Sequence, residues 1–164
     1  MNRDRIAPGP GQESVWDYPR PPRLEESPVH IEIVFNGVTI ADTHRAQRVL
    51  ETSHPPVYYL PPADIKMEHL VITPERSFCE WKGNAVYSTV LVGDKEVRLA
   101  AWGYPNPTPA FAAIQDYIAF YAHMMDACYV NGERVQPQPG NFYGGWITSN
   151  IVGPFKGAPG TWGW

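Results

Sequence analysis

The residues best suited to chemistry begin in the stretch from Arg45 to Tyr59, which reads RAQRVLETSHPPVYY. Glu51 and His54 lie three positions apart in it, and a carboxylate beside an imidazole can form a general acid–base pair. The Pro55-Pro56 pair that follows restricts the backbone and holds these side chains in place. The structural alternative is a glutamate at the end of a strand, paired with a nearby cation for stability. Both interpretations of the stretch stay open.

A second cluster, Cys79-Glu80-Trp81-Lys82-Gly83, places a thiol three residues before an ammonium group. A nearby ammonium stabilises a thiolate, which makes Cys79 a candidate nucleophile. A small hydrophobic core residue is the structural alternative for the same cysteine.

Large aromatic residues accompany both clusters and form a third one, Trp102-Gly103-Tyr104-Pro105. Together they could line a cage for a flat or cationic ligand, and core packing is the alternative role. Tyr58 and Tyr59 are neighbours in a predicted strand and therefore face opposite sides of it. At most one of the two can point into a given pocket.

Several common catalytic signatures are absent from the sequence. It contains neither glycine-rich phosphate-binding pattern, G-x-x-x-x-G-K-[ST] or G-x-G-x-x-G, and no Asp-x-Asp pair for metal-dependent phosphoryl chemistry. Its two cysteines, Cys79 and Cys128, form no C-x-x-C motif, which excludes a zinc ribbon. His123 and Cys128 supply too few ligands for a metal. We therefore expect no metal site and no cofactor.

Length and composition favour a single globular domain. A chain of 164 residues buries roughly 70% of its unfolded surface, so it can be stable without metal or disulfide. The net charge of −4 argues against nucleic acid as a partner. No apolar run has the length of a membrane span, and the first residues lack the apolar core of a signal peptide. We expect a cytoplasmic protein with reduced cysteines and no membrane association.

The elements that would position the three clusters are short strands. Residues 29–35 alternate in polarity, and Asn36-Gly37 predicts a hairpin that returns through residues 38–40. Further hairpins are predicted over residues 86–102 and 129–135. Residues 46–50 fit either a strand or a short helix, and we favour the strand because Pro55 would stop a helix early.

One main α-helix is predicted over about residues 109–126. Thr108 is a suitable N-cap with Pro109 at the first helical position. Apolar residues then recur at three- and four-residue spacing: Phe111, Ile114, Ile118, Tyr121 and Met125. A short helical turn is also predicted over residues 63–70.

The two ends of the chain differ from its middle. Residues 1–27 show no apolar period and predict an extended N-terminal arm, packed through Trp16 and Tyr18. The tail over residues 139–164 is rich in aromatic residues, so we expect it to cover a sheet edge or a groove.

Three strings, NGVTIADTHRAQRVLETSHPPVYYLP, CEWKG and AAWGYPNPTPAFAAIQDYIAFY, occur in this order within about residues 29–126. They resemble the bacterial domain-of-unknown-function family number 427, and the aromatic tail resembles its longer members. Where that family usually has Cys-Pro-Tyr/Trp-Lys-Gly, this chain has Glu80 in place of the proline. The resemblance implies a β-tent fold, whose other members hold zinc on paired C-x-x-C motifs. This chain lacks those cysteines, so only the position of a pocket between the sheets carries over, as a fold analogy.

We therefore expect an α+β, mainly β domain of β-tent type over residues 28–164. The leading hypothesis for function is a small-molecule pocket, or an enzyme of undetermined reaction. Its expected lining is Arg45, Glu51, His54, Tyr59, Cys79, Lys82, Trp102 and Tyr104. In the enzyme version Glu51 is the acid or base, Cys79 the nucleophile, and Lys82 and Arg45 hold an anionic group. Glu51 and Lys82 are expected to lie within about 4 Å of each other or to line the same cleft.

Two other functions are weighed against this one. An interaction module could use the aromatic tail for self-association, for example as a homodimer. The family is also sometimes labelled a nucleotidyltransferase, but the Gly-Ser helix start followed by Asp-x-Asp that such enzymes use is missing.

Overall fold

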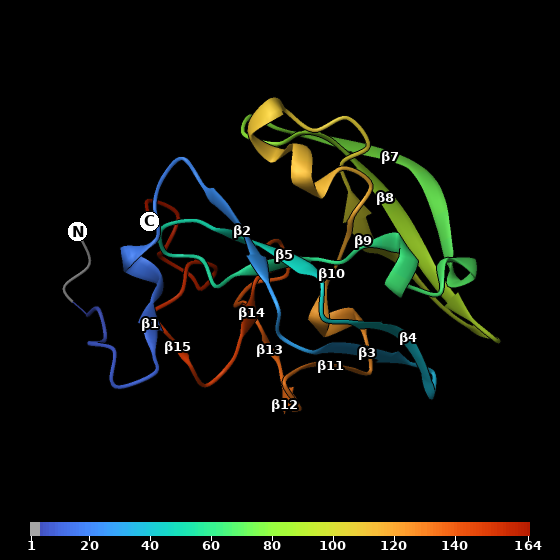
Figure 1. The fold of residues 1–164 in the computed structure, drawn as a ribbon. Coiled ribbons are helices and arrows are strands. Elements are labelled where there is room, and N and C mark those ends of the chain that lie inside the picture. Colours follow the sequence, from blue (N-terminus) through green and yellow to red (C-terminus); the bar gives the residue numbers. More distant parts are fainter. Residues whose placement is uncertain (1–3) are drawn as a thin grey trace.

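The structure, a computed structural model, describes residues 4–164 and is built mainly from β-strands, as the sequence predicts. In chain order the strands are β1 (Glu13–Ser14), β2 (Arg23–Ser27), β3 (Ile31–Phe35), β4 (Val38–Thr43), β5 (Ala46–Leu50), β6 (Val57–Tyr59), β7 (Leu70–Cys79), β8 (Gly83–Val92), β9 (Lys95–Gly103), β10 (Ile118–Phe120), β11 (Ala127–Val130), β12 (Glu133–Arg134), β13 (Gln136–Pro137), β14 (Trp146–Ile147) and β15 (Ile151–Val152). Within residues 4–164 the helical segments are short 3₁₀-helices: η1 (Val15–Asp17), η2 (Pro62–Asp64), η3 (Met67–His69), η4 (Pro109–Ile114) and η5 (Ala122–Met124). Figure 1 shows their arrangement.

The first large sheet is antiparallel, with the strand order β10-β9-β8-β7. Its centre is the β8–β9 hairpin, which turns at Gly93, where a φ of 60° suits a residue without a side chain. The hairpin predicted over residues 86–102 is thus confirmed. The sequence did not predict β7, because Pro74 interrupts its apolar pattern. Proline is tolerated in this strand because β7 lies at the sheet edge, where its register with β8 shifts between Ile72 and Arg76.

The second large sheet, with the order β12-β11-β3-β4, is built on two Asn-Gly turns. Asn36 and Gly37 have φ values of 48° and 75°, and Asn131 and Gly132 have values of 49° and 80°. Two consecutive residues with positive φ are typical of the tight turn that joins twisted antiparallel strands. Both of these hairpins were predicted and are confirmed.

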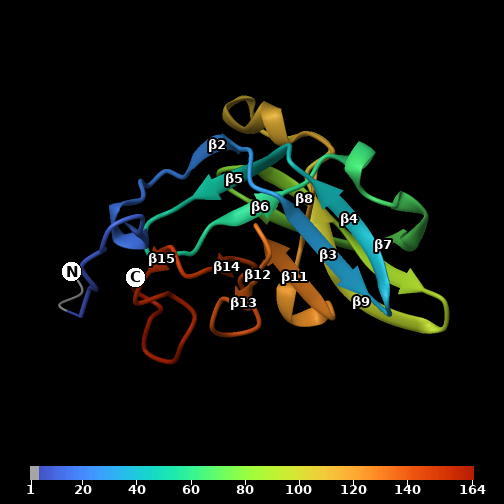
Figure 2. The same cartoon turned by 60° about the horizontal axis from the view of Figure 1, so that its bottom comes forward.

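The main core lies between these two sheets. Ile31, Ile33 and Phe35 alternate along β3 and are fully buried, in one cluster with Val90 of β8 and Phe120 of β10. Figure 2 shows β3, β4 and β11 lying over β8 and β9. The polar–apolar alternation of residues 29–35 therefore predicted the buried side of this strand correctly.

A third sheet, β2-β5-β6, adjoins the first one and frames the candidate site. Residues 46–50 form its central strand, so the strand interpretation of this segment is confirmed. Leu60, directly after β6, exchanges backbone hydrogen bonds with Ile118 of β10, at 2.8 and 2.9 Å. This link brings the ends of β5 and β6 next to β9 and β10.

The N-terminal arm and the tail pack against each other rather than extending freely. The first three residues of the predicted arm lie outside the described residues; of the others, residues 23–27 form β2 and pair with β5. Tyr18 is buried and Trp16 half-buried, as predicted, in a cluster with Ile151 of the tail. β1 pairs in parallel with β15, and Figure 1 shows β1, β15 and the C-terminus on one side of the molecule.

The prediction of one main α-helix over residues 109–126 is wrong. The segment folds as η4, then β10 paired with β9, then η5. Gln115 is extended and Asp116 has a φ of 63°, which ends the helical conformation after Ile114. η4 begins where the helix was predicted to begin, with Thr108 at the N-cap position and Pro109 in the first turn, but the Thr108 hydroxyl makes no capping hydrogen bond and donates instead to the carbonyl of Trp81 at 2.6 Å. The predicted turn over residues 63–70 is present as η2 and η3.

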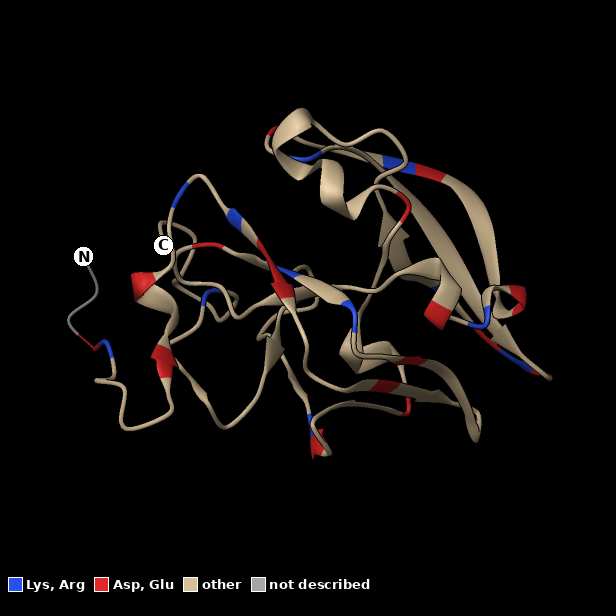
Figure 3. Ribbon diagram, in the orientation of Figure 1, with Lys and Arg blue, Asp and Glu red and all other residues tan. Residues whose placement is uncertain are grey.

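Charges are distributed over the whole fold. Figure 3 shows positive and negative positions interspersed along the ribbon, while the tail is almost free of colour. From Val135 to Trp164 the sequence has a single charged residue, Lys156. Within residues 4–164 no helix has both the length and the apolar character needed to cross a membrane.

Candidate functional site

A cleft of about 570 Å³ opens where the ends of β5 and β6, the β7–β8 turn and the tail meet. Seven of the eight site residues expected from the sequence line it: Glu51, His54, Tyr59, Cys79, Lys82, Trp102 and Tyr104. The three sequence clusters therefore come together in space.

Arg45 is the exception, and its placement in this site was wrong. It precedes β5, whereas Glu51 follows the strand, and six residues at the rise of a strand separate the two by roughly 20 Å. Arg45 pairs instead with Asp64, at 2.7 Å between Nη2 and Oδ1, and its side chain is 65% exposed. It lines a different hollow, beside β2.

The floor of the cleft is aromatic. The Tyr59 ring contacts Trp102 edge-on, at 6.3 Å between centroids, and lies 6.2 Å from the Tyr104 ring. Tyr58, its neighbour in β6, packs against Trp146 in the main core, so the two tyrosines face opposite sides as predicted. Burial raises the pKa of Tyr59 well above its ordinary value, and burial also raises the pKa of Tyr104. Both hydroxyls are therefore protonated at neutral pH.

Glu51 is held by a residue of the arm that the sequence did not single out. Arg20 Nε donates to Glu51 Oε2 at 3.2 Å, and Arg20 Nη2 donates to the carbonyl of Thr52 at 3.0 Å. Glu51 and Lys82 line the same cleft, which is one of the two predicted arrangements, but the ion pair of Glu51 is with Arg20.

His54 is held in one tautomer by Gln138 of the tail. Gln138 Oε1 accepts a hydrogen bond from the backbone N–H of Gly145 at 3.0 Å, which identifies this atom as the amide oxygen. The atom of the amide group that contacts His54 is therefore the nitrogen. That nitrogen donates to the carbonyl of Lys156 at 2.8 Å and to Nδ1 of His54 at 3.1 Å. Because Nδ1 is an acceptor, neutral His54 carries its proton on Nε2, which lies 3.8 Å from Glu51 Oε2.

The charge state of His54 follows from its surroundings. Burial, followed by the positive charges of Lys156, Arg20 and Lys82, lowers the pKa of His54 to about 4. The ring is therefore neutral at neutral pH, and it presents an N–H toward Glu51.

Two ammonium groups face the cleft. Lys82 Nζ lies 5.9 Å from the Tyr104 ring centre and 5.8 Å from that of Phe111, and Lys156 Nζ lies 5.7 Å from that of Tyr143. Among residues 4–164, neither ammonium has a carboxylate oxygen within 4.0 Å, whereas Lys95 forms a 2.9 Å ion pair with Asp126.

The two cysteines have different environments. Both thiols are free; Cys79 is half-buried at the end of β7 and lines the cleft. Cys128 is fully buried in the main core, and burial raises the pKa of its thiol. Cys128 thus has the core role that was the structural alternative for Cys79, while Cys79 itself lines the cleft.

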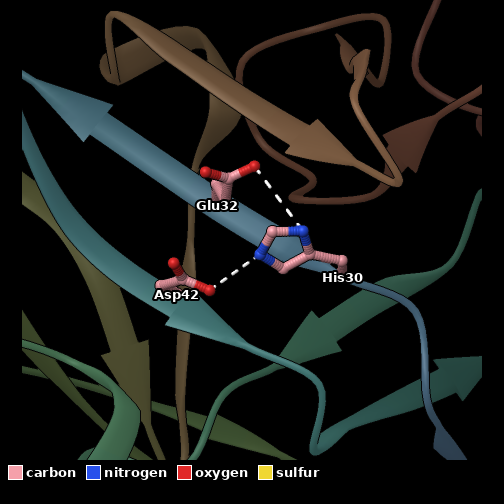
Figure 4. Close-up of side chains that lie close together, drawn as sticks. All are labelled: His30, Glu32 and Asp42. Carbon is pink, nitrogen blue, oxygen red and sulfur yellow. Dashed lines mark hydrogen bonds and ion pairs between the residues drawn. The ribbon is translucent and has the colours of Figure 1, made fainter.

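A separate cluster of possible metal ligands lies on the second large sheet (Figure 4). Asp42 Oδ1 lies 2.7 Å from His30 Nε2, and Glu32 Oε1 lies 3.7 Å from His30 Nδ1. These are three donors on neighbouring strands, and they are the group of three that the described residues offer for a metal ion. Glu32 and Asp42 contact opposite nitrogens of the His30 ring. An ion bound at one nitrogen could therefore bind both carboxylates only if the carboxylate at the other nitrogen moved. The arrangement shown is a histidine that links β3 and β4 through side-chain contacts.

The tail supplies residues that the sequence analysis missed, among them Gln138, Tyr143 and Lys156. Gly144 and Gly145 bring the tail onto the cleft, because a Cβ on Gly144 would lie 2.2 Å from the Trp102 ring. The signal that could have found Lys156 is its isolation, as the one charge in the thirty residues from Val135 to Trp164.

Comparison with known proteins places most of the chain in one family. No curated protein matches the sequence. A family model described as Domain of unknown function (DUF427) matches residues 23–131, which are 109 of the 164 residues. Arg20 of the arm, together with Gln138, Tyr143 and Lys156 of the tail, lies outside this range, whereas the residues nominated from the sequence lie within it. Because the match covers more than half of the chain, the protein belongs to the DUF427 family.

Proposed function

We propose that the cleft binds a small organic molecule. The observation that carries this proposal is the convergence of seven polar and aromatic residues, from three separate segments, on one cavity of about 570 Å³. Ligand sites have volumes of roughly 300–1,000 Å³ and combine apolar walls with a few fixed polar groups. His54, Glu51 and the two lysines supply such groups, and each is held by a contact described above.

Within this proposal, catalysis uses the same residues. Cys79 is the candidate nucleophile, because its thiol lies in the cleft, and Glu51 is the candidate acid or base. His54 does not act as a base through Nδ1, since that nitrogen already accepts a hydrogen bond from Gln138.

Native mass spectrometry of protein purified from its own cells tests the proposal. A retained small molecule, released on denaturation, is expected for the wild type and for Tyr129→Ala, which is outside the cleft. It should be lost or reduced in Tyr143→Ala, which removes a ring from the cleft wall. The proposal is contradicted if all three proteins retain the molecule equally, or if none of them retains a molecule at any expression level.

A second candidate function is self-association through the tail. Phe142 and Trp162 are 73% and 80% exposed beside a hollow of about 500 Å³ formed by the tail. Exposed apolar groups of this kind commonly mark interaction surfaces. Sedimentation of the wild type should show a dimer that Trp162→Ser dissociates, and a monomer throughout the micromolar range would exclude this function.

We further propose that the fold is of the β-tent type. Two antiparallel four-stranded sheets that enclose one core support this assignment. Superposition of an experimental structure on β-tent domains, with equivalent strand order and connections, is the test.

A further inference from the structure

The ligand class can be narrowed by the charges that the cleft leaves without partners; this inference rests on the proposed binding function. The chain has four lysines, and they differ in their surroundings. Lys66 is exposed, and Lys95 is paired with Asp126. Lys82 and Lys156 are half-buried, line the cleft, and have no carboxylate oxygen within 4.0 Å among the described residues.

Both lysines are held in place by their backbones. The carbonyl of Lys82 accepts the N–H of Thr108 at 3.1 Å. Lys156 donates its N–H to the carbonyl of Ser53 at 2.9 Å, and its own carbonyl accepts from Gln138 at 2.8 Å. A bound anion would therefore meet two ammonium groups on backbones that are already ordered.

Aromatic rings compensate these ammonium groups only in part. A cation over an aromatic face gains roughly 0.5–1 kcal/mol when it is partly exposed, less than a charge-assisted hydrogen bond provides. Two carboxylates line the same cleft: Glu51 is paired with Arg20, and Glu80 is exposed to solvent, which screens its charge. After burial, the positive charges of Lys156, Arg20 and Lys82 contribute to the lowered pKa of His54, so all three act on the same part of the cleft.

The walls of the cleft suit a flat ring. Nine of its 22 lining residues are Phe, Trp or Tyr, so aromatic side chains form a large part of its walls. The ring of Trp102 lies 4.5 Å from that of Tyr121 between ring centres, and Gly144 approaches the Trp102 ring without a side chain. Ring stacking and edge contacts in such a site add to the area that a planar ligand buries.

We infer that the cleft takes a planar aromatic molecule that carries one carboxylate or phosphate, with the anionic group held by Lys82 and Lys156. Lys156 takes the place that the sequence analysis gave to Arg45. The tail, which lies outside the family match, thus supplies half of the charge that selects the ligand.

Four probes separate the parts of this inference in calorimetric titrations. 2-Naphthoate and 2-naphthyl phosphate carry the ring and an anion, 2-naphthamide keeps the ring without the charge, and cyclohexanecarboxylate keeps the charge without a flat ring. We expect at least one naphthyl anion to bind about 10-fold or more tightly than both 2-naphthamide and cyclohexanecarboxylate. The preferred anion identifies the ligand as a carboxylate or a phosphate.

Variants connect this binding to the two lysines. Lys82→Met and Lys156→Met should each weaken the preferred anion about 10-fold and leave the affinity for 2-naphthamide unchanged. Lys66→Met is the matched control and should change neither affinity. Urea midpoints equal to that of the wild type show that the variants are folded.

Other results overturn the inference. Equal binding of amide and anion, or anion binding that survives both lysine substitutions, removes the charged part, and equal binding of cyclohexanecarboxylate removes the planar part. In these cases small-molecule binding itself still stands. If none of the four probes binds, the ligand class is wrong, and the retained-mass experiment decides separately whether the cleft is a binding site.

Discussion

The side-chain amide nitrogen of Gln138 lies 3.1 Å from Nδ1 of His54, although 84 residues separate them in the chain. One belongs to the tail and the other to the part matched by the family model. The contact ties the tautomer of a cleft residue to a segment outside that match. A family member without this tail would lack the donor that fixes His54.

Replacing Gln138 with Glu should change the protonation of His54. A carboxylate cannot donate to Nδ1, so the ring must place a proton there, either by exchanging tautomers or by becoming charged. In ¹⁵N spectra at pH 7, the wild type should show a protonated Nε2 and an unprotonated Nδ1, and Gln138→Glu should show a protonated Nδ1.

Gln115→Glu is the control for this experiment, because Gln115 donates to the carbonyl of Pro105, away from His54. A merely structural role of Gln138 would alter stability without moving the proton. The same Nδ1 state in Gln138→Glu and the wild type would refute the assignment.

His54 should also make stability depend on pH. The pKa of His54 is about 4 in the folded protein, against 6.5 as its ordinary value, and its side chain is 12% exposed. Between pH 6.5 and 4 the unfolded chain takes up a proton that the folded protein does not, so the free energy of unfolding falls as pH falls. The loss is about 1.4 kcal/mol per pH unit and totals roughly 3 kcal/mol by pH 4.

Urea unfolding of the wild type and of His54→Gln at several pH values isolates this effect from other titrating groups. The difference in unfolding free energy, wild type minus variant, should rise from pH 4 to pH 6.5 and be constant above it. A flat difference over this range contradicts the neutral, buried state of His54.

Gly144 should be required for the shape of the cleft. A Cβ at this position would lie 2.2 Å from the Trp102 ring, so Gly144→Ala must displace either the tail or the indole. We expect a changed near-ultraviolet circular dichroism spectrum, and loss of any bound ligand. Gly163→Ala is the matched control, since a Cβ there meets nothing within 4 Å. Binding that is equal in both variants would show that the tail does not form this wall.

The elements that local chemistry decides could be predicted from the sequence. Asn36-Gly37 and Asn131-Gly132 set their turns by themselves, because few residues adopt two consecutive positive φ values. The segment after Thr108 could not be assigned in the same way. Three- and four-residue spacing is typical of an α-helix, but the pairing of Ile118–Phe120 with β9 is a tertiary contact that overrides it and that spacing does not encode.

In the candidate site, too, local spacing predicts only the contacts between residues that are close together in the sequence. Pairs such as Glu51 and His54 are close in sequence, so their proximity follows from the local chain. Arg45 was misplaced because the strand that follows it carries it away from Glu51. Gln138 and Lys156 reach the cleft through long-range packing of the tail, on which local spacing gives no information.

The last prediction concerns Arg48, which joins the arm to β5. Its Nη1 lies 2.6 Å from Glu13 Oε1 and its Nε lies 2.6 Å from Glu25 Oε1, with 15% of the side chain exposed. Arg48→Met removes the partner that Glu13 and Glu25 share, leaving them only the Tyr18 hydroxyl and Arg23, and should lower the free energy of unfolding by about 2–3 kcal/mol. This is less than the roughly 3–5 kcal/mol typical of a fully buried pair, because the carboxylates stay about one-third exposed.

Arg45→Met is the matched control: its ion pair with Asp64 is on the surface, where salt and water screen it, so the urea midpoint should not change. Equal effects of the two substitutions would mean that Arg48 anchors the arm no better than a surface charge does.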